Sequence, residues 1–289
     1  MQTVPASRHL FGVLCVIGAT VAWSTFGFFT LSVSADTPTV LVWRGIFGVL
    51  SLLLVLVLRE GLAGFSGFRR LGRMGWAFAA SGGLAGLTTI MALRETSVTH
   101  VAVIFAMAPF CAAVLGWLFL SERPSRSAVI ASGIALLGAV IMVGLGGEGT
   151  LYGDALAVVS VIAYSGLIVI SKSNPGIPSL PASVLAVLFT AVAAVPFMTG
   201  FAIPSADLPM LAAFGIVNSA LAIWLFMIGA RHLPAIQTAL IGALETPLAP
   251  FWVWLAFGIA PSLLTMVGAA IVVGAVVWHI VQDPEPAGH

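Results

Sequence analysis

Two charged residues, Arg44 and Glu245, lie well inside long apolar segments of the sequence. A charge at the centre of a bilayer costs at least about 2.5 to 3.5 kcal/mol, so each side chain should face a partner or water. In one interpretation Arg44 binds a substrate carboxylate, and Glu245 binds the ammonium group of that substrate or a proton. In the other, the two residues form a fixed ion pair that positions their helices. The sequence leaves both interpretations open.

Aromatic residues recur at a similar depth. Trp23 and Tyr164 each lie roughly 18 to 20 Å along an apolar segment, near the middle of a bilayer and away from the interfaces where aromatic belts form. Their N–H and O–H groups need partners, which favours the wall of a cavity, but simple core packing explains them equally well. Trp224 and His100 are candidates of the same kind. A lone histidine inside a membrane is more often a packing residue than a proton relay.

Two prolines, Pro109 and Pro247, stand in the middle of apolar segments. Each removes a backbone donor and should free the carbonyl four residues earlier, at Phe105 and Ala243. The sequence therefore predicts helix kinks near the middle of the membrane. Irregular backbone at that depth is tolerated where it lines a cavity, which we favour over a plain packing kink.

The elements that position these residues follow from the composition of the chain. Its 289 residues are 60% hydrophobic and only 7% charged, with a mean hydropathy of +1.15, so lipid must be the solvent. Every backbone group in lipid must be paired within its own segment, and the alternation of barrel strands is absent, so the fold class is all-α. Ten apolar segments are long enough to span a bilayer: 10–33, 38–58, 74–93, 98–120, 125–145, 152–171, 181–202, 208–230, 235–257 and 262–281. Arg59 to Arg73 is expected to be the longest connection.

The distribution of basic residues predicts the orientation of these helices. An even number of spans puts both termini on the same side, and the positive-inside rule makes that side the cytoplasm. Arg94 is then the one basic residue at the outer side. The basic residues assigned to the cytoplasmic side are Arg8, Arg59, Arg69, Arg70, Arg73, Arg123, Arg126, Lys172 and Arg231.

The chain repeats itself at a nearly constant offset. Moving it by 141 residues places Gly12, Ala22 and Ser24 on Gly153, Ala163 and Ser165, and similar offsets place Trp117 on Trp254 and Pro109 on Pro247. We therefore expect two five-helix repeats, residues 1–147 and residues 148–289. Because five is odd, the second repeat must cross the membrane in the opposite sense, and a binding site is expected near the midplane between the halves.

Three segments resemble a known family: Ala92 to Val98, Pro109 to Arg123 and Leu244 to Pro247. They are similar to the EamA-type members of the drug/metabolite transporter superfamily, and most similar to the YddG-type exporters of aromatic and other amino acids. The resemblance covers nearly the whole chain and implies a ten-helix, multi-pass protein of the inner (plasma) membrane. One departure is visible, since the acid usual after the fourth helix, Glu122, is replaced after the ninth helix by Ile259 and Ala260.

Several other classes of function fit the sequence poorly. The formal net charge is +1 and no long basic stripe exists, which excludes nucleic acid as a partner. The motifs of rhomboid-like and presenilin-like proteases, of zinc proteases and of nucleotide-binding P-loops are missing, so we expect no enzyme, no cofactor and no metal. An intramembrane enzyme and a lipid-flipping protein remain the alternatives from other classes.

The charges and rings narrow the class of substrate. Phosphorylated substrates should need several buried cations, whereas the spans offer only Arg44. One acid, one base and aromatic walls suit an amino acid, aromatic or neutral such as Met or Thr, exported by a monomer through alternating access. A broad drug or metabolite exporter is the alternative. The residues expected to bind substrate are Trp23, Arg44, His100, Tyr164, Trp224 and Glu245.

Overall fold

The computed structural model describes residues 6–144 and 149–282. Within these ranges, ten helical spans are long and apolar enough to cross a membrane, and no β-strand occurs. The all-α fold with ten transmembrane helices is therefore confirmed. The expected boundary between the halves, at residues 147 and 148, lies outside the described residues.

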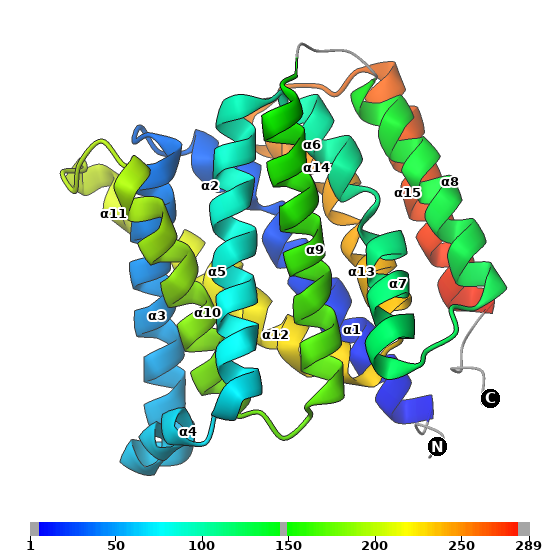
Figure 1. Ribbon diagram of the computed structural model, residues 1–289. Coiled ribbons are helices and arrows are strands. Elements are labelled where there is room, and N and C mark those ends of the chain that lie inside the picture. Colours follow the sequence, from blue (N-terminus) through cyan, green and yellow to red (C-terminus); the bar gives the residue numbers. More distant parts are fainter. Residues whose placement is uncertain (1–5, 145–148, 283–289) are drawn as a thin grey trace.

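The spans are formed by the helices labelled in Figure 1. The first five consist of α1 (Ala6–Ser24) with α2 (Phe26–Leu31), α3 (Thr37–Glu60), α5 (Gly72–Glu95), α6 (Val98–Phe105) with α7 (Ala108–Leu120), and α8 (Arg126–Val143). The second five consist of α9 (Leu151–Ser173), α10 (Ser179–Ala194), α11 (Leu208–Phe214) with a π-helix (Gly215–Leu221) and α12 (Ala222–Gly229), α13 (Ala235–Gly242) with α14 (Glu245–Phe257), and α15 (Leu263–Gln282).

Polar side chains fix where several of these helices begin. In each case the side chain of the residue just before the helix accepts a hydrogen bond from the backbone N–H three residues later. These residues are Asp36 before α3, Ser97 before α6, Ser125 before α8 and Thr150 before α9. Such caps satisfy donors that have no partner within the helix. In a bilayer they also mark the depth at which the apolar segment must begin.

The packing of the spans repeats when each span is exchanged for the span five places later. The pair α5 and α9 has its equivalent in α12 and α1, and the contact of α5 with α10 has its equivalent in the contact of the π-helix with α3. Two further contacts join a span directly to its own equivalent: α8 of the fifth span packs on α15 of the tenth, and α7 of the fourth span packs on α13 of the ninth. In Figure 1, α1 begins at the lower end of the molecule and α9 begins at the upper end. The two halves therefore run in opposite senses, as an inverted repeat requires.

This arrangement gives the molecule two distinct ends. The terminal face is the end where α1 begins and α15 ends, and the distal face is the opposite end, uppermost in Figure 1. The segment from Arg59 to Arg73, expected as a loop, lies at the terminal face and is largely helical, with a 3-10 helix (Gly61–Phe65) followed by α4 (Ser66–Arg69). Gly61 ends α3 with a φ of 62°, a value that other residues rarely adopt, and this turn lets the chain continue in a new direction.

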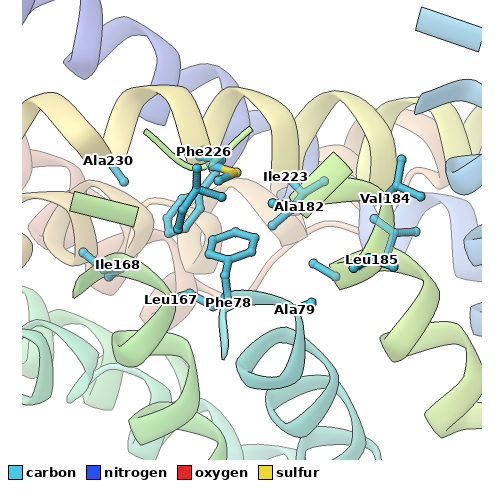
Figure 2. Packing of buried hydrophobic residues seen from close by; sticks show 14 of the residues in the cluster. Phe78, Ala79, Leu167, Ile168, Ala182, Val184, Leu185, Ile223, Phe226 and Ala230 are labelled. Carbon is cyan, nitrogen blue, oxygen red and sulfur yellow. The ribbon is translucent and has the colours of Figure 1, made fainter. Parts of the chain in front are cut away.

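The largest apolar core lies between α5, α9, α10 and α12 (Figure 2). Phe78 of α5 and Phe226 of α12 are completely buried there, and they are surrounded by smaller aliphatic residues such as Ile168 and Ala182. Many large apolar side chains point outward instead, as Phe119 and Leu58 do with exposures of 72% and 75%. Their exposure fits a surface that is solvated by lipid.

Candidate substrate-binding site

A large cavity lies inside the bundle, with a volume of about 750 Å³. All ten spans contribute residues to its wall. The volume falls in the range of small-molecule sites, and most of the wall is apolar, with a few polar groups among the aliphatic ones. The cavity is therefore suited to a small amphiphile and lies between the two halves of the chain.

The cavity extends toward the distal face. Met142 and Val143, at the end of α8, and Thr265, near the start of α15, belong to its wall and lie at that face. Toward the terminal face the wall ends at Leu167 of α9 and Ala239 of α13, roughly one to two helical turns before these helices reach that face.

Polar contacts between helices close the terminal face below the cavity. Glu122, which follows α7, forms an ion pair with Lys172 near the end of α9. The same carboxylate accepts a hydrogen bond of 3.0 Å from the backbone N–H of Ala235, the first residue of α13. Arg231 donates to the carbonyl of Ile177 at 2.8 Å. The contacts of Glu122 join spans four, six and nine at this end, and the Arg231 bond joins the end of span eight to the loop before span seven.

Arg44 lies in the cavity wall, where two phenylalanine rings and one amide hold it. Its Cζ atom lies 5.2 Å from the ring centre of Phe214 and 5.6 Å from that of Phe26, and its Nη1 donates to the side-chain carbonyl of Asn218. The buried Nε atom has no partner among the described residues. Because a guanidinium carries five N–H donors, most of them are left without a protein acceptor. Such a group can bind a carboxylate through two parallel hydrogen bonds.

Glu245 is the first residue of α14 and faces the same cavity. Its side chain is exposed to that space, and no hydrogen bond to its carboxylate occurs within residues 6–144 and 149–282. Arg44 and Glu245 interact electrostatically, but no ion pair joins them within residues 6–144 and 149–282. The fixed ion pair of the second interpretation is therefore absent from this arrangement, and each charge is turned toward the cavity.

Trp23 and Tyr164 meet in the wall, together with a third ring that the sequence did not single out. The ring centres of Trp23 and Tyr164 are 6.4 Å apart in an edge-to-face arrangement, and Phe226 lies 5.1 Å from Trp23 and 5.8 Å from Tyr164. Phe226 is fully buried behind the other two rings. It stabilises their orientation, so the aromatic face offered to the cavity is preformed.

The structure places two of the expected site residues away from the cavity wall. His100 lies at the distal face, where its Nδ1 contacts both carboxylate oxygens of Asp154 at 3.0 Å. Trp224 lies beneath Arg59 near the terminal face, with the guanidinium carbon 5.3 Å from its ring centre. Neither residue is among those that line the cavity.

The fourth and ninth spans, which contain Pro109 and Pro247, are both interrupted next to the cavity. α6 ends at Phe105 and α7 begins at Ala108, while α13 ends at Gly242 and α14 begins at Glu245. Phe105 and Ala243 line the cavity, whereas Pro109 and Pro247 themselves do not. The Ala243 carbonyl is not left free as expected, because it accepts a hydrogen bond of 3.2 Å from the Thr246 N–H. The next turn closes more tightly and recovers the bond that Pro247 cannot make.

Asn218 is a cavity residue that sequence reasoning missed. It is 2% exposed, lies in the π-helix, and joins Arg44 to the backbone of α1. The sequence could have indicated this residue, since Asn218 is the one asparagine within the apolar segments. A polar amide at that depth is costly without partners, so the reasoning that identified Arg44 applies to it as well.

Comparison with known proteins agrees with this architecture. The sequence profile of the EamA-like transporter family matches residues 10–144 and again residues 151–281. A search of curated proteins found no match. One solved crystal structure, whose description gives no function, is similar to this chain with a TM-score of 0.79 at 20% sequence identity, over 94% of this chain and 96% of the other. At that identity the likeness concerns the fold alone. The two profile matches cover nearly all of the described residues, and the chain therefore belongs to the EamA-like transporter family, within the drug/metabolite transporter superfamily.

Proposed function

We propose that this membrane transporter exports amino acids, aromatic ones and other neutral ones such as Met and Thr, by alternating access. The observation that carries the proposal is the pair of opposite charges, Arg44 and Glu245, which face one cavity without pairing with each other. An amino acid has the complementary pair, a carboxylate for Arg44 and an ammonium group for Glu245. In a largely apolar cavity inside the membrane, an uncompensated charge is expensive, so the two residues favour a zwitterion over a singly charged ligand.

The aromatic wall supports a preference for large apolar side chains. Trp23 and Tyr164 offer a preformed surface beside the two charges. Burying an aromatic or thioether side chain there contributes roughly 1.5 to 3 kcal/mol, or about one to two decades in affinity. The volume of about 750 Å³ exceeds what one amino acid fills, so side-chain shape should be read loosely. The same volume favours a broad drug or metabolite exporter as the second candidate.

The subtype proposed on this basis is that of the YddG-type exporters. The resemblance of the chain as a whole to that group supports it, and so does the presence of an acid and an aromatic wall in one cavity. Substrate would enter the cavity from one face and leave by the other as the halves, residues 1–147 and 148–289, rock about it.

Counterflow in proteoliposomes tests the proposal directly. Vesicles loaded with unlabelled phenylalanine should accumulate labelled phenylalanine, and Met and Thr should compete with it better than Asp or Lys. The Arg44→Gln variant is the matched control, because it removes the carboxylate partner and should abolish the exchange. Equal competition by Asp and Phe would refute a zwitterion site. Exchange of a large cationic drug without exchange of phenylalanine would establish the second candidate instead.

We further propose that the terminal face is cytoplasmic, that the protein resides in the inner membrane, and that it works as a monomer. Most basic residues outside the membrane core, such as Arg8, Arg69 and Arg123, stand at helix ends on the terminal face, which supports this orientation. The cavity is complete within one chain, which supports a monomer. An alkaline phosphatase fusion after His289 should be inactive in a bacterial host, and a fusion in the distal loop at Ser205 should be active. The reverse pattern would invert the orientation.

A further inference from the structure

The side chain of Asn218 connects three spans at the centre of the molecule. Its Oδ1 accepts a hydrogen bond from Nη1 of Arg44 in α3, and its Nδ2 donates to the carbonyls of Ala22 and Trp23 in α1, both at 3.0 Å. Only one orientation of the amide satisfies these partners, because a guanidinium can only donate and a carbonyl can only accept. One neutral side chain thus links the cation of the cavity to the helix that carries the aromatic wall.

The local backbone is built to bring Asn218 to this place. The π-helix Gly215–Leu221 widens the eighth span by one residue per turn, and α3 packs directly on its start. A Cβ atom on Gly215 would lie 2.5 Å from Phe47 Cβ and 2.6 Å from the Arg44 carbonyl oxygen, so only glycine permits this approach. The close contact places Asn218 beside the Arg44 side chain. π-helical turns of this kind occur frequently at functional sites.

The two carbonyls that Asn218 binds belong to an interruption in the first span. α1 ends at Ser24 and α2 begins at Phe26, so the last carbonyls of α1 lack regular helical partners. The Asn218 amide donates to two of them, the Ala22 carbonyl, which also accepts from Thr25, and the Trp23 carbonyl. The position of Trp23 at the cavity wall therefore depends on the same side chain that orients Arg44.

We propose that Asn218 is the positioning and selectivity residue of the transport site. It holds the Arg44 guanidinium toward the cavity while leaving its positive charge uncompensated, so that the substrate carboxylate neutralises it. This inference rests on the proposed amino-acid site and identifies the feature that makes the site require a carboxylate. An acidic residue at this position would neutralise Arg44 from within the protein and remove that requirement.

The test compares phenylalanine with phenylalanine amide, which lacks the carboxylate but keeps the ring and the amino group. In the wild type, phenylalanine should compete in counterflow at least about tenfold better than the amide. In the nearly isosteric Asn218→Asp variant, the KM for phenylalanine should rise by about tenfold to a hundredfold while the amide competes as well as before or better. Asn174→Asp is the matched control, because Asn174 lies just past the end of α9, away from the cavity, and makes only local contacts.

A merely structural asparagine would behave differently. Its replacement would lower the amount of folded protein and the turnover of both ligands equally, without changing their ratio. If Asn218→Asp is not monodisperse in detergent, Asn218→Ser replaces it, and the preference for phenylalanine over the amide should then fall several-fold toward equality. A folded variant that keeps the wild-type ratio would overturn the proposal. A wild-type protein that exchanges no amino acid would instead overturn the proposed function, so the two failures are distinguishable.

Discussion

The carboxylate of Glu245 is the polar group whose removal should separate transport from folding most cleanly. It faces the cavity and makes no hydrogen bond with the described residues, so the folded protein does not depend on it for satisfied partners. We expect Glu245→Gln to raise the KM for phenylalanine by at least about tenfold, since a neutral amide loses the attraction for an ammonium group. Thermal unfolding in detergent should shift little. Counterflow and a melting curve on the same preparation measure both quantities.

A loss of folding in Glu245→Gln would indicate that Arg44 and Glu245 stabilise the structure and do not bind substrate. If Glu245→Gln aggregates, and the double variant Arg44→Ala with Glu245→Ala restores a folded and active carrier, then the two charges serve to neutralise each other. The Glu60→Gln variant is a suitable control. Glu60 is exposed at the end of α3, outside the cavity, and the same change of charge there should affect neither property.

Three aromatic substitutions test which rings contact substrate. Trp23 and Tyr164 line the cavity, whereas Trp224 lies outside it beneath Arg59. Truncation of Trp23 or Tyr164 to Ala should weaken competition by phenylalanine by about ten- to a hundredfold and competition by threonine much less, because the larger side chain loses more buried contact. Trp224→Ala removes a similar ring and should leave the ratio unchanged. Competition by Phe, Met and Thr against labelled phenylalanine gives the comparison.

Equal losses for all three variants would mean that the rings act only through stability. A change of the ratio in Trp224→Ala alone would move the site away from the cavity wall described here. Phe226, which packs behind Trp23 and Tyr164, is unchanged in all three variants. Because that support stays in place, each truncation leaves the remaining ring oriented.

At the level of residues, the sequence could predict which side chains are costly in a membrane but not which way they point. Arg44, Glu245, Trp23 and Tyr164 were identified by depth, and the structure brings them to one cavity. His100 has comparable chemistry but lies at the distal face, where it contacts Asp154 outside the cavity wall. Depth follows from 1.5 Å per residue, whereas the direction of a side chain around its helix is set by packing against helices far away in sequence.

At the level of elements, interruptions caused by proline could be predicted and interruptions caused by packing could not. Pro109 and Pro247 indicated breaks in the fourth and ninth spans, and both helices are broken just before them. The interruption at Thr25 and the π-helix at Gly215–Leu221 contain no proline, so the sequence does not predict them. The side chain of Asn218, in the π-helix, donates to the two carbonyls that precede Thr25, and a single segment of sequence contains no sign of such a partner on another span.

The proline breaks themselves should matter more for turnover than for binding. Pro109 lies in the first turn of α7, and in Pro109→Ala the restored N–H can pair with the Phe105 carbonyl and join α6 to α7 into one continuous helix. We expect stability to hold or rise, the KM for phenylalanine to stay within about threefold, and kcat to fall by at least about tenfold, because the halves of the span can no longer move separately. Rates of counterflow at saturating substrate measure the change.

A proline in a first helical turn provides the control for this experiment. Pro209 is exposed and is the second residue of α11, as Pro109 is of α7, but only a three-residue 3-10 turn precedes it in its span, so Pro209→Ala should leave turnover unchanged. Unchanged turnover in Pro109→Ala as well would show that tertiary packing, and not the proline, maintains the break.

At the level of the whole molecule, the repeat could be predicted from the sequence, but the conformation of the transporter could not. Near-constant offsets between equivalent residues predict two inverted five-helix units, and the symmetric packing of the spans agrees with this prediction. The sequence is the same in every state of the transport cycle, however, so nothing in it indicates that the cavity extends to the distal face while the terminal face is closed. That difference is a small free energy between two packings of the same helices.

An asymmetry between the repeats suggests how this free energy is set. Glu122 joins the end of α7 to Lys172 and to the first N–H of α13 at the terminal face. The equivalent position after α14 carries Ile259 and Ala260, which offer no carboxylate at the distal face. The Glu122 ion pair at the terminal face therefore has no counterpart after α14, and it should favour the conformation in which the terminal face is closed.

The last prediction is that weakening this closure shifts the protein toward the opposite conformation. Thr265→Cys, placed in a protein whose Cys15 and Cys111 are replaced by Ala, reports access to the cavity from the distal face through labelling by an impermeant maleimide. Adding Glu122→Gln keeps the shape of the side chain but removes the charge that binds Lys172. It should slow distal labelling measurably and by at most about fivefold, because a loss of about 1 kcal/mol from one of two states changes their ratio about fivefold. Glu60→Gln, an equal change of charge elsewhere on the terminal face, should leave the rate unaltered. If both variants label at the same rate, the ion pair contributes nothing to the choice of state, and the closed terminal face must be attributed to apolar packing alone.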